Sequence, residues 1–293
     1  MPIKLYEWQT HAHPRGESKI PPVEVDPRKL CLEPESLIFE RLLAALTWLN
    51  GNVNKRGMLK GVRVASICFA SSDGENYTAR STEIERLQRQ VEELIRALHR
   101  KGVAFVTGTG NEYARFQRPG MGWPAIVPET ISVGAVFDLD LSRDDFKYYI
   151  QTKGHFRYLL AAPAQKQRIK PGQLLPITQR LAWKNPRDRR IHTTVFAPGS
   201  LVESVSITGP QGYELLEGTS QAVSVVAATV ALLQQASYLH SGKYCSGEKI
   251  RHWLSHGANT RRDAGDDGVG DTYLKYPMLD VRGAMNHLLG KVA

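Results

Sequence analysis

Two short segments of small residues could carry chemistry. The first, Gly218-Thr219-Ser220-Gln221-Ala222, stands directly before a strongly apolar stretch that predicts a helix. A serine at a helix N-terminus has an exposed hydroxyl, and the unpaired N–H groups and helix dipole beside it stabilise developing negative charge. The position therefore suits a nucleophile at Ser220, although serine and threonine are also common N-cap residues, and the motif alone favours that structural role.

The second segment, Thr107-Gly108-Thr109-Gly110-Asn111, comes directly after Val103–Thr107, an apolar run that predicts a short buried strand. In parallel α/β sheets, functional residues gather where strands end at their carboxyl edge. The residues that follow predicted strands are therefore the candidates for a functional site.

The elements that would position these segments alternate between helix and strand. Ser36–Leu49 has helical spacing of leucines, and Thr82 with Glu85 predicts a capping box at the start of a second helix. The other expected helices are Ser220–Tyr238, Glu248–Ser255 and Val281–Leu289, and the expected strands are Met1–Trp8, Val62–Phe69, Val103–Thr107, Ile131–Phe137 and Thr193–Ala197. This alternation predicts an α/β fold, a mostly parallel sheet with helices on both faces.

Composition excludes several classes of protein. The chain has 293 residues with 42% apolar and 23% charged residues, which is ordinary globular composition rather than that of a disordered or fibrous chain. The run Ala222–Leu233 is too short for a membrane span, and the N-terminus lacks a signal peptide, so a cytoplasmic location is the default expectation. Three scattered cysteines predict no disulfide framework, and Asp263–Gly268 fails the calcium-loop template, so neither metal nor cofactor is expected.

The positive charge is concentrated in one stretch. Lys and Arg number 38 against 29 Asp and Glu, a net +9, and residues 141–195 with twelve basic and three acidic residues account for all of it. Several prolines there argue against one long helix. The stretch is interpreted as a solvated surface excursion or, alternatively, as a docking surface for an acidic partner such as nucleic acid.

Four landmarks in order resemble the subtilase (subtilisin-like serine peptidase) family. They are the run Leu98–Val136, which ends in Pro124-Ala-Ile-Val-Pro-Glu-Thr-Ile-Ser-Val-Gly-Ala135, the turn Ala197-Pro198-Gly199, the Gly218–Ala222 motif, and the closing Tyr276–Ala284. The resemblance covers nearly the whole chain as a single incomplete domain, residues 1–293, in which 141–195 looks like a basic insertion.

The resemblance implies roles for individual residues. Ser220 matches the catalytic nucleophile and Asn111 the amide that donates to the oxyanion, a donor whose loss costs on the order of 10²–10³ in turnover in subtilisin, the worked example for this effect. Five further residues match substrate-binding positions around the scissile bond: Ser72, Gly74, Gly108, Gly110 and Thr219.

The resemblance also shows what the sequence lacks. The family supplies an Asp in a D-[ST]-G turn and a His in an H-G-T motif, and neither pattern occurs here. Met1–Trp8 resembles the strand that follows the family's His helix, which indicates an N-terminally truncated chain. His11 and His13 are the nearest substitutes for the base, but no motif supports them.

Two functions therefore compete. The first is a subtilisin-like serine endopeptidase, inactive as the isolated chain, that acts on polypeptides once a separate chain supplies the missing Asp and His segment. The alternative is a non-catalytic relative that binds peptides or protein partners. A gene remnant without function is a third interpretation, and substrate specificity is not readable from the sequence.

Overall fold

The fold is an α/β sandwich around one mixed sheet. The computed structural model describes residues 35–55, 61–71, 76–79, 85–138, 149–153, 156–160, 170–182, 187, 189–200, 202–205, 213–263 and 275–290. Its sheet has the order β1 (Val64–Ile67), β2 (Ala104–Gly108), β3 (Thr130–Val136), β6 (Val195–Pro198), β10 (Lys275–Met278) and β9 (Asn259–Arg262). All neighbours are parallel except β10 and β9, which confirms the predicted mostly parallel sheet.

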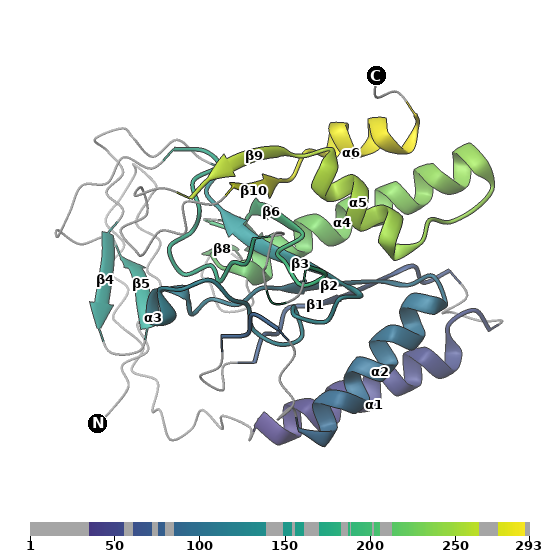
Figure 1. The fold of residues 1–293 in the computed structure, drawn as a ribbon, viewed down its shortest axis with the longest axis horizontal. Helices are drawn as coiled ribbons and strands as arrows, with labels where there is room; N and C mark the ends of the chain where they lie inside the picture. Colours follow the sequence, from purple (N-terminus) through teal and green to yellow (C-terminus); the bar gives the residue numbers. More distant parts are fainter. Residues whose placement is uncertain are drawn as a thin grey trace.

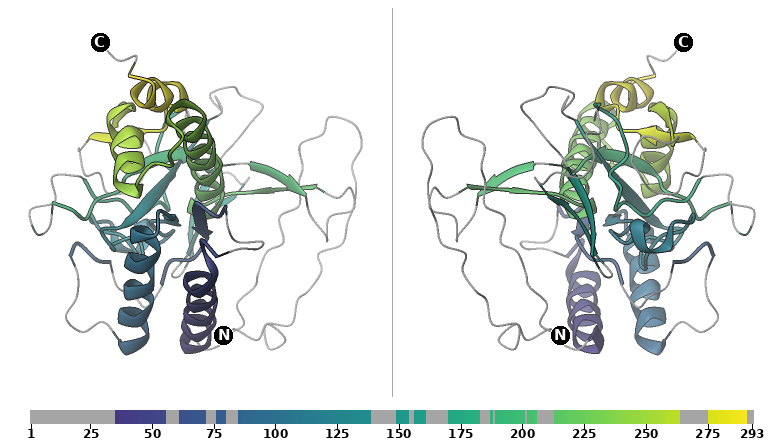
Figure 2. Two further views of the ribbon diagram at one scale, coloured as in Figure 1. Left: turned by 90° about the vertical axis from the view of Figure 1, so that its right-hand side faces the viewer. Right: turned by 90° about the vertical axis from the view of Figure 1, so that its left-hand side faces the viewer.

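Helices cover both faces of the sheet, as the sequence predicts (Figures 1 and 2). On one face lie α1 (Glu35–Asn52) and α2 (Arg86–Arg100), and on the other lie α4 (Thr219–Ser241), α5 (Gly247–His256) and α6 (Val281–Leu288). Alternate residues of the strands point to opposite faces of the sheet: Phe105 packs with α1 and α2, whereas Val106 packs against α4. The central strands are therefore buried on both sides and read as continuous apolar runs.

Several strands and boundaries differ from the sequence-based expectation. The hairpins β4–β5 (Tyr149–Lys153 and Phe156–Leu160) and β7–β8 (Val202–Val205 and Tyr213–Leu216) were not expected, nor were β9 and β10. The helix α2 begins at Arg86 with Glu85 as its N-cap and no capping side-chain hydrogen bond, and Thr82 lies outside the described residues. The short helix α3 (Tyr113–Phe116) follows the turn after β2.

Part of the basic stretch belongs to the core. From Gln173 to Ala182 every residue except the half-buried Ile177 is buried, and the Arg180 side chain is fully buried in a two-point ion pair with Asp263 at 2.8 and 3.0 Å. The guanidinium also lies 3.4 Å from the centroid of the Tyr113 ring. This part is therefore not a solvated excursion, while the division of 141–195 as an insertion remains a prediction.

The helix α4 is long and apolar enough to cross a membrane by length and composition alone, and it is the one such helix in the described part of the chain. One side of it is fully buried through Ala222, Val226, Val230 and Leu233, which pack on the sheet. This burial is that of a core helix.

Candidate active site

Ser220 lies in the first turn of α4, at the edge of the sheet where the parallel strands end. The segment after β6 approaches it, because Gly218 N–H donates to the carbonyl of Gly199 at 2.7 Å. The end of β2 also lies close, since a Cβ added to Gly108 would come within 2.7 Å of Thr219 Oγ1. Glycine at 108 thus permits the close contact between β2 and the start of α4.

Asn111 and the start of α4 are joined by a hydrogen bond. The side-chain oxygen Oδ1 of Asn111 accepts from the backbone N–H of Thr219 at 3.0 Å. With Oδ1 engaged, the amide nitrogen Nδ2 is turned to the neighbouring Gly218, where an added Cβ would lie 3.0 Å from it. The two segments that the sequence singled out therefore meet, and a side-chain N–H₂ donor stands beside the N–H groups of the first helical turn.

The turn at Gly110 depends on glycine. Its φ of +105° is unfavourable for other residues, and a Cβ there would overlap the side-chain oxygen of Gln179. Gln179 in turn donates from Nε2 to Asn76 Oδ1 at 2.9 Å, and its backbone N–H donates to the carbonyl of Gly110 at 2.9 Å. A buried amide pair therefore fixes the backbone between β2 and Asn111.

Two predicted binding residues, Ser72 and Gly74, lie outside the described residues, as do His11 and His13. Ser71, directly before Ser72, is described: its N–H donates to the carbonyl of Trp123 at 2.7 Å.

The structure adds Cys68, which sequence reasoning missed. Its Sγ donates to the carbonyl oxygen of Ser220 at 3.4 Å, and burial raises the pKa of the thiol above its ordinary value while a hydrogen bond with Ser224 lowers it less. Because β1 ends at Ile67, Cys68 is the first residue beyond the carboxyl end of the strand, whereas the sequence placed it inside the expected strand Val62–Phe69.

The Glu217 carboxyl is a second group that the sequence did not point to, and it lies three residues before Ser220. Burial raises the pKa of its carboxyl to about 8, and the atom Oε2 has no hydrogen-bond partner within the described structure. The buried oxygens Thr109 Oγ1, Ser200 Oγ and Gln221 Oε1 likewise lack partners there. Of these four residues, Glu217 and Gln221 flank Ser220 in the chain, and Thr109 and Ser200 lie just after β2 and β6.

No histidine among the residues described forms a hydrogen bond with Ser220. The histidines in question lie elsewhere: His99 ends α2, His192 precedes β6, His240 ends α4, and His252, His256 and His287 form a cluster on α5 and α6. Burial, with Arg251 nearby, lowers the pKa of His192 to about 4, so this imidazole is neutral at ordinary pH. The described part of the chain also contains no cluster of ligands that could hold a metal ion.

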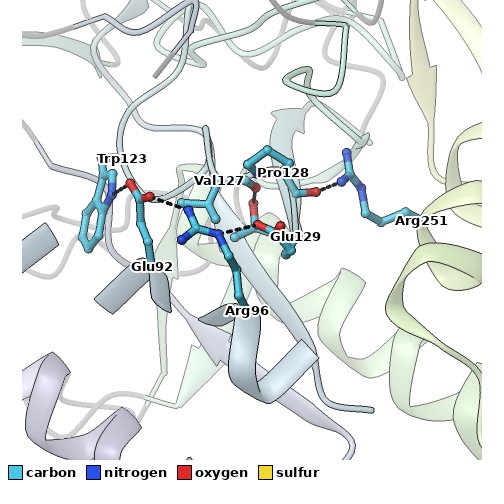
Figure 3. A network of polar contacts seen from close by, with 8 residues as sticks. Glu92, Arg96, Trp123, Val127, Pro128, Glu129 and Arg251 are labelled. Carbon is cyan, nitrogen blue, oxygen red and sulfur yellow. Dashed lines mark hydrogen bonds and ion pairs between the residues drawn. The ribbon is translucent and has the colours of Figure 1, made fainter. Parts of the chain in front are cut away.

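A polar network holds the segment that leads from α3 into β3 (Figure 3). The buried carboxylate of Glu92 accepts from Trp123 Nε1 at 3.3 Å and from Arg96 at 2.8 Å. Arg96 also pairs with Glu129 at 3.6 Å, and Arg251 of α5 donates to the carbonyl of Pro128. This network holds the indole of Trp123, and the backbone carbonyl of the same residue accepts the N–H of Ser71.

Comparison with known proteins agrees with this geometry. The sequence pattern of the subtilase family matches residues 23–273. No curated protein matches the sequence.

Among solved structures, the patellamide maturation protease PatA is similar with a TM-score of 0.53 at 19% identity, over 85% of this chain and 69% of that one. The PatG macrocyclase domain is similar with a TM-score of 0.52 at 18% identity, over 86% of this chain and 57% of that one. A lanthipeptide protease is similar with a TM-score of 0.50 at 18% identity, over 87% of this chain and 66% of that one. These identities establish the fold, and the family match over most of the sequence establishes more: the chain belongs to the subtilase family.

Proposed function

We propose that this chain carries the nucleophile and oxyanion hole of a serine endopeptidase acting on polypeptides. The observation that carries the proposal is the hydrogen bond between Asn111 Oδ1 and Thr219 N–H, which aligns a free amide donor with the N-terminus of the helix that bears Ser220. Membership of the subtilase family supports it. So do similar structures whose names describe peptide processing, including PatG macrocyclase in complex with peptide.

The proposed reaction is acyl transfer. Ser220 Oγ attacks the carbonyl carbon of the scissile peptide while its proton passes to a base. Asn111 Nδ2 and backbone N–H groups of the first turn of α4 stabilise the oxyanion that forms. The C–N bond then breaks, the amine leaves with the proton, and water releases the acyl group from Ser220 in the second half of the cycle.

The base and its orienting carboxylate are the parts that the described residues do not supply to Ser220. No described histidine forms a hydrogen bond with Ser220, and a serine hydroxyl without a base is a weak nucleophile. We therefore propose that the isolated chain is inactive, and that a separate polypeptide supplies the Asp and His groups.

Fluorophosphonate labelling tests this proposal. The purified chain should not be labelled at Ser220, whereas the same chain in an extract of its native cells should be labelled, with Ser220→Ala as the control in both cases. Stoichiometric labelling of the purified chain would show that the base lies within this chain. Absence of labelling in both settings would contradict the peptidase proposal.

The same lack of a described base favours a second candidate, a peptide-binding module without catalysis. This candidate predicts that a fluorescent peptide library contains members that bind the purified chain and that the Ser220→Ala variant binds them equally. It also predicts that the native extract cleaves none of them at a Ser220-dependent rate.

The positive charge of residues 141–195 supports the proposal that this stretch binds an acidic partner. Its surplus charge includes the cluster Lys166–Lys170, and Lys170 is exposed. Reversal of the charges of Lys166, Arg168 and Lys170 to Glu should abolish a gel shift with nucleic acid, and it avoids the buried residues that follow Gly172. An unchanged shift would exclude this cluster as the docking surface.

A further inference from the structure

The strand β1 forms an open edge of the sheet. It pairs with β2 in register from Val64 with Ala104 to Ile67 with Thr107, and no described strand lies on its other side. Alternate backbone groups of a β-strand point to each side, so this edge presents N–H and C=O groups that an added strand would pair with. Such an edge is a docking site for an extended segment.

A groove runs along this edge between β1 and α1. It has a volume of about 630 Å³, and all four residues of β1 line it. Its other walls are mostly apolar side chains of α1, among them Leu42, Leu46 and Leu49, with Trp48 on the rim at 57% exposure. The groove would bury the apolar face of a strand that paired with β1.

We propose that the chain's own N-terminal segment, Met1–Trp8, occupies this groove as a strand parallel to β1. As a strand, the segment would place Met1, Ile3 and Leu5 on one face, which is apolar up to Glu7, and Lys4 on the other face, between Pro2 and Tyr6. At about 3.3 Å per residue it would reach about 26 Å, enough to cover the about 13 Å of β1. Pro2 falls at the start of the strand, where its missing N–H is tolerated.

The direction of α1 explains why the added strand would run parallel to β1. Phe39 near the start of α1 packs on Phe69, with ring centroids 5.7 Å apart, so α1 begins at the carboxyl end of β1. At its other end, Lys101 just before β2 donates to the carbonyl of Asn50, so α1 ends at the amino edge. A strand, this helix and β1 together form a β–α–β unit, whose two strands are parallel.

Tethering favours this occupant over a second copy or another chain. Residues 9–34 connect Trp8 to Glu35, so the segment is present at an effective concentration on the order of millimolar. A parallel arrangement also brings the residues after Trp8 to the edge that holds Ser220, because Cys68 at the end of β1 contacts the Ser220 carbonyl. His11 and His13 belong to those residues.

Disulfide trapping tests both the site and the direction. In a Cys31→Ser background, single cysteines at Trp8, Gln9 and Thr10 are each oxidised with the native, exposed Cys68. At least one of the three should form an intramolecular disulfide with Cys68, whereas Pro2→Cys, at the opposite end, should not. A bond from Pro2→Cys instead, bonds only between chains, or no bond at all would each overturn the proposal.

Hydrogen exchange of the full-length chain gives a second measurement that needs no new covalent bond. The Leu5→Pro variant should increase the exchange rate of peptides that cover Val64–Ile67 by about tenfold or more, because the added strand no longer protects the edge. The matched variant Ile20→Pro, outside the segment, should leave that rate unchanged. Equal exchange in all three proteins, or protection that depends on protein concentration, would contradict the proposal. Labelling of Ser220 measures the proposed function, so the two proposals fail separately.

Discussion

Asn111 Oδ1 accepts the backbone N–H of Thr219 at 3.0 Å, and this bond joins the turn after β2 to the first residue of α4. Residues more than a hundred positions apart thereby form one site. The bond satisfies one of the N–H groups that a helix N-terminus leaves without an intrahelical partner. It also leaves the amide nitrogen of Asn111 available to a ligand.

A pair of substitutions at Asn111 separates its acceptor from its donor. Asn111→Ala removes the bond and should lower the free energy of unfolding by about 1 kcal/mol. Asn111→Asp keeps an acceptor and adds negative charge near the helix N-terminus, so its stability should stay close to that of the wild type. Urea denaturation measures both; an Asp variant as unstable as the Ala variant would contradict the assigned role of Oδ1.

Gly110 should not tolerate a side chain. Alanine would be strained at a φ of +105° and would displace the side-chain oxygen of Gln179, so Gly110→Ala should cost about 1–3 kcal/mol of stability. Gly51→Ala is the matched control, because Gly51 lies in α1 with open space around its α-carbon, and it should stabilise the protein by about 0.5–1 kcal/mol. The midpoint temperature of thermal unfolding should therefore fall in Gly110→Ala and rise in Gly51→Ala.

The Arg180–Asp263 pair should be essential for stability. Both side chains are buried, at 0% and 1% exposure, so Asp263→Ala would leave an uncompensated guanidinium and should cost about 3–5 kcal/mol. The more exposed pair Arg115–Glu112 is the control, and Glu112→Ala should cost less than about 1 kcal/mol. Similar losses in the two variants, measured by chemical denaturation, would show that burial of the Arg180 pair does not matter.

Glu217 should make stability depend on pH in an unusual direction. Burial raises the pKa of its carboxyl to about 8 in the folded chain, from an ordinary value of 4.5. Between these values the folded state holds a proton that the unfolded state has lost, so the free energy of unfolding should fall as pH rises from about 4.5 to 8. Glu217→Gln cannot ionise, and it should be more stable than the wild type at pH 8 by about 1 kcal/mol or more.

Thermal melts of the wild type and the Glu217→Gln variant across this pH window measure the effect. At pH 4.5 the two proteins should differ little, since the wild-type carboxyl is then protonated in the folded state. Parallel curves for the two proteins would mean that the Glu217 carboxyl ionises in the folded chain at its ordinary pKa.

The sequence by itself determined the class of fold, and it predicts the residues at the centre of the candidate site. Apolar runs such as Ile131–Phe137 identified the buried strands, because strands covered on both faces need continuous apolar side chains. Small residues before the apolar helix made Ser220 a candidate nucleophile, which stays a prediction, and the order of landmarks identified the subtilase family. Periodicity did not reveal β9 (Asn259–Arg262), because this polar edge strand has no apolar alternation.

Only the tertiary structure decided which groups meet. The bond from Asn111 to Thr219, the contact of Cys68 with Ser220, and the burial of Arg180 against Asp263 each join residues far apart in the chain. Local patterns carry no information on such pairs, since they depend on how the strands are ordered and how the helices cross them. For the same reason a basic stretch that looked solvated contributes a buried ion pair to the core.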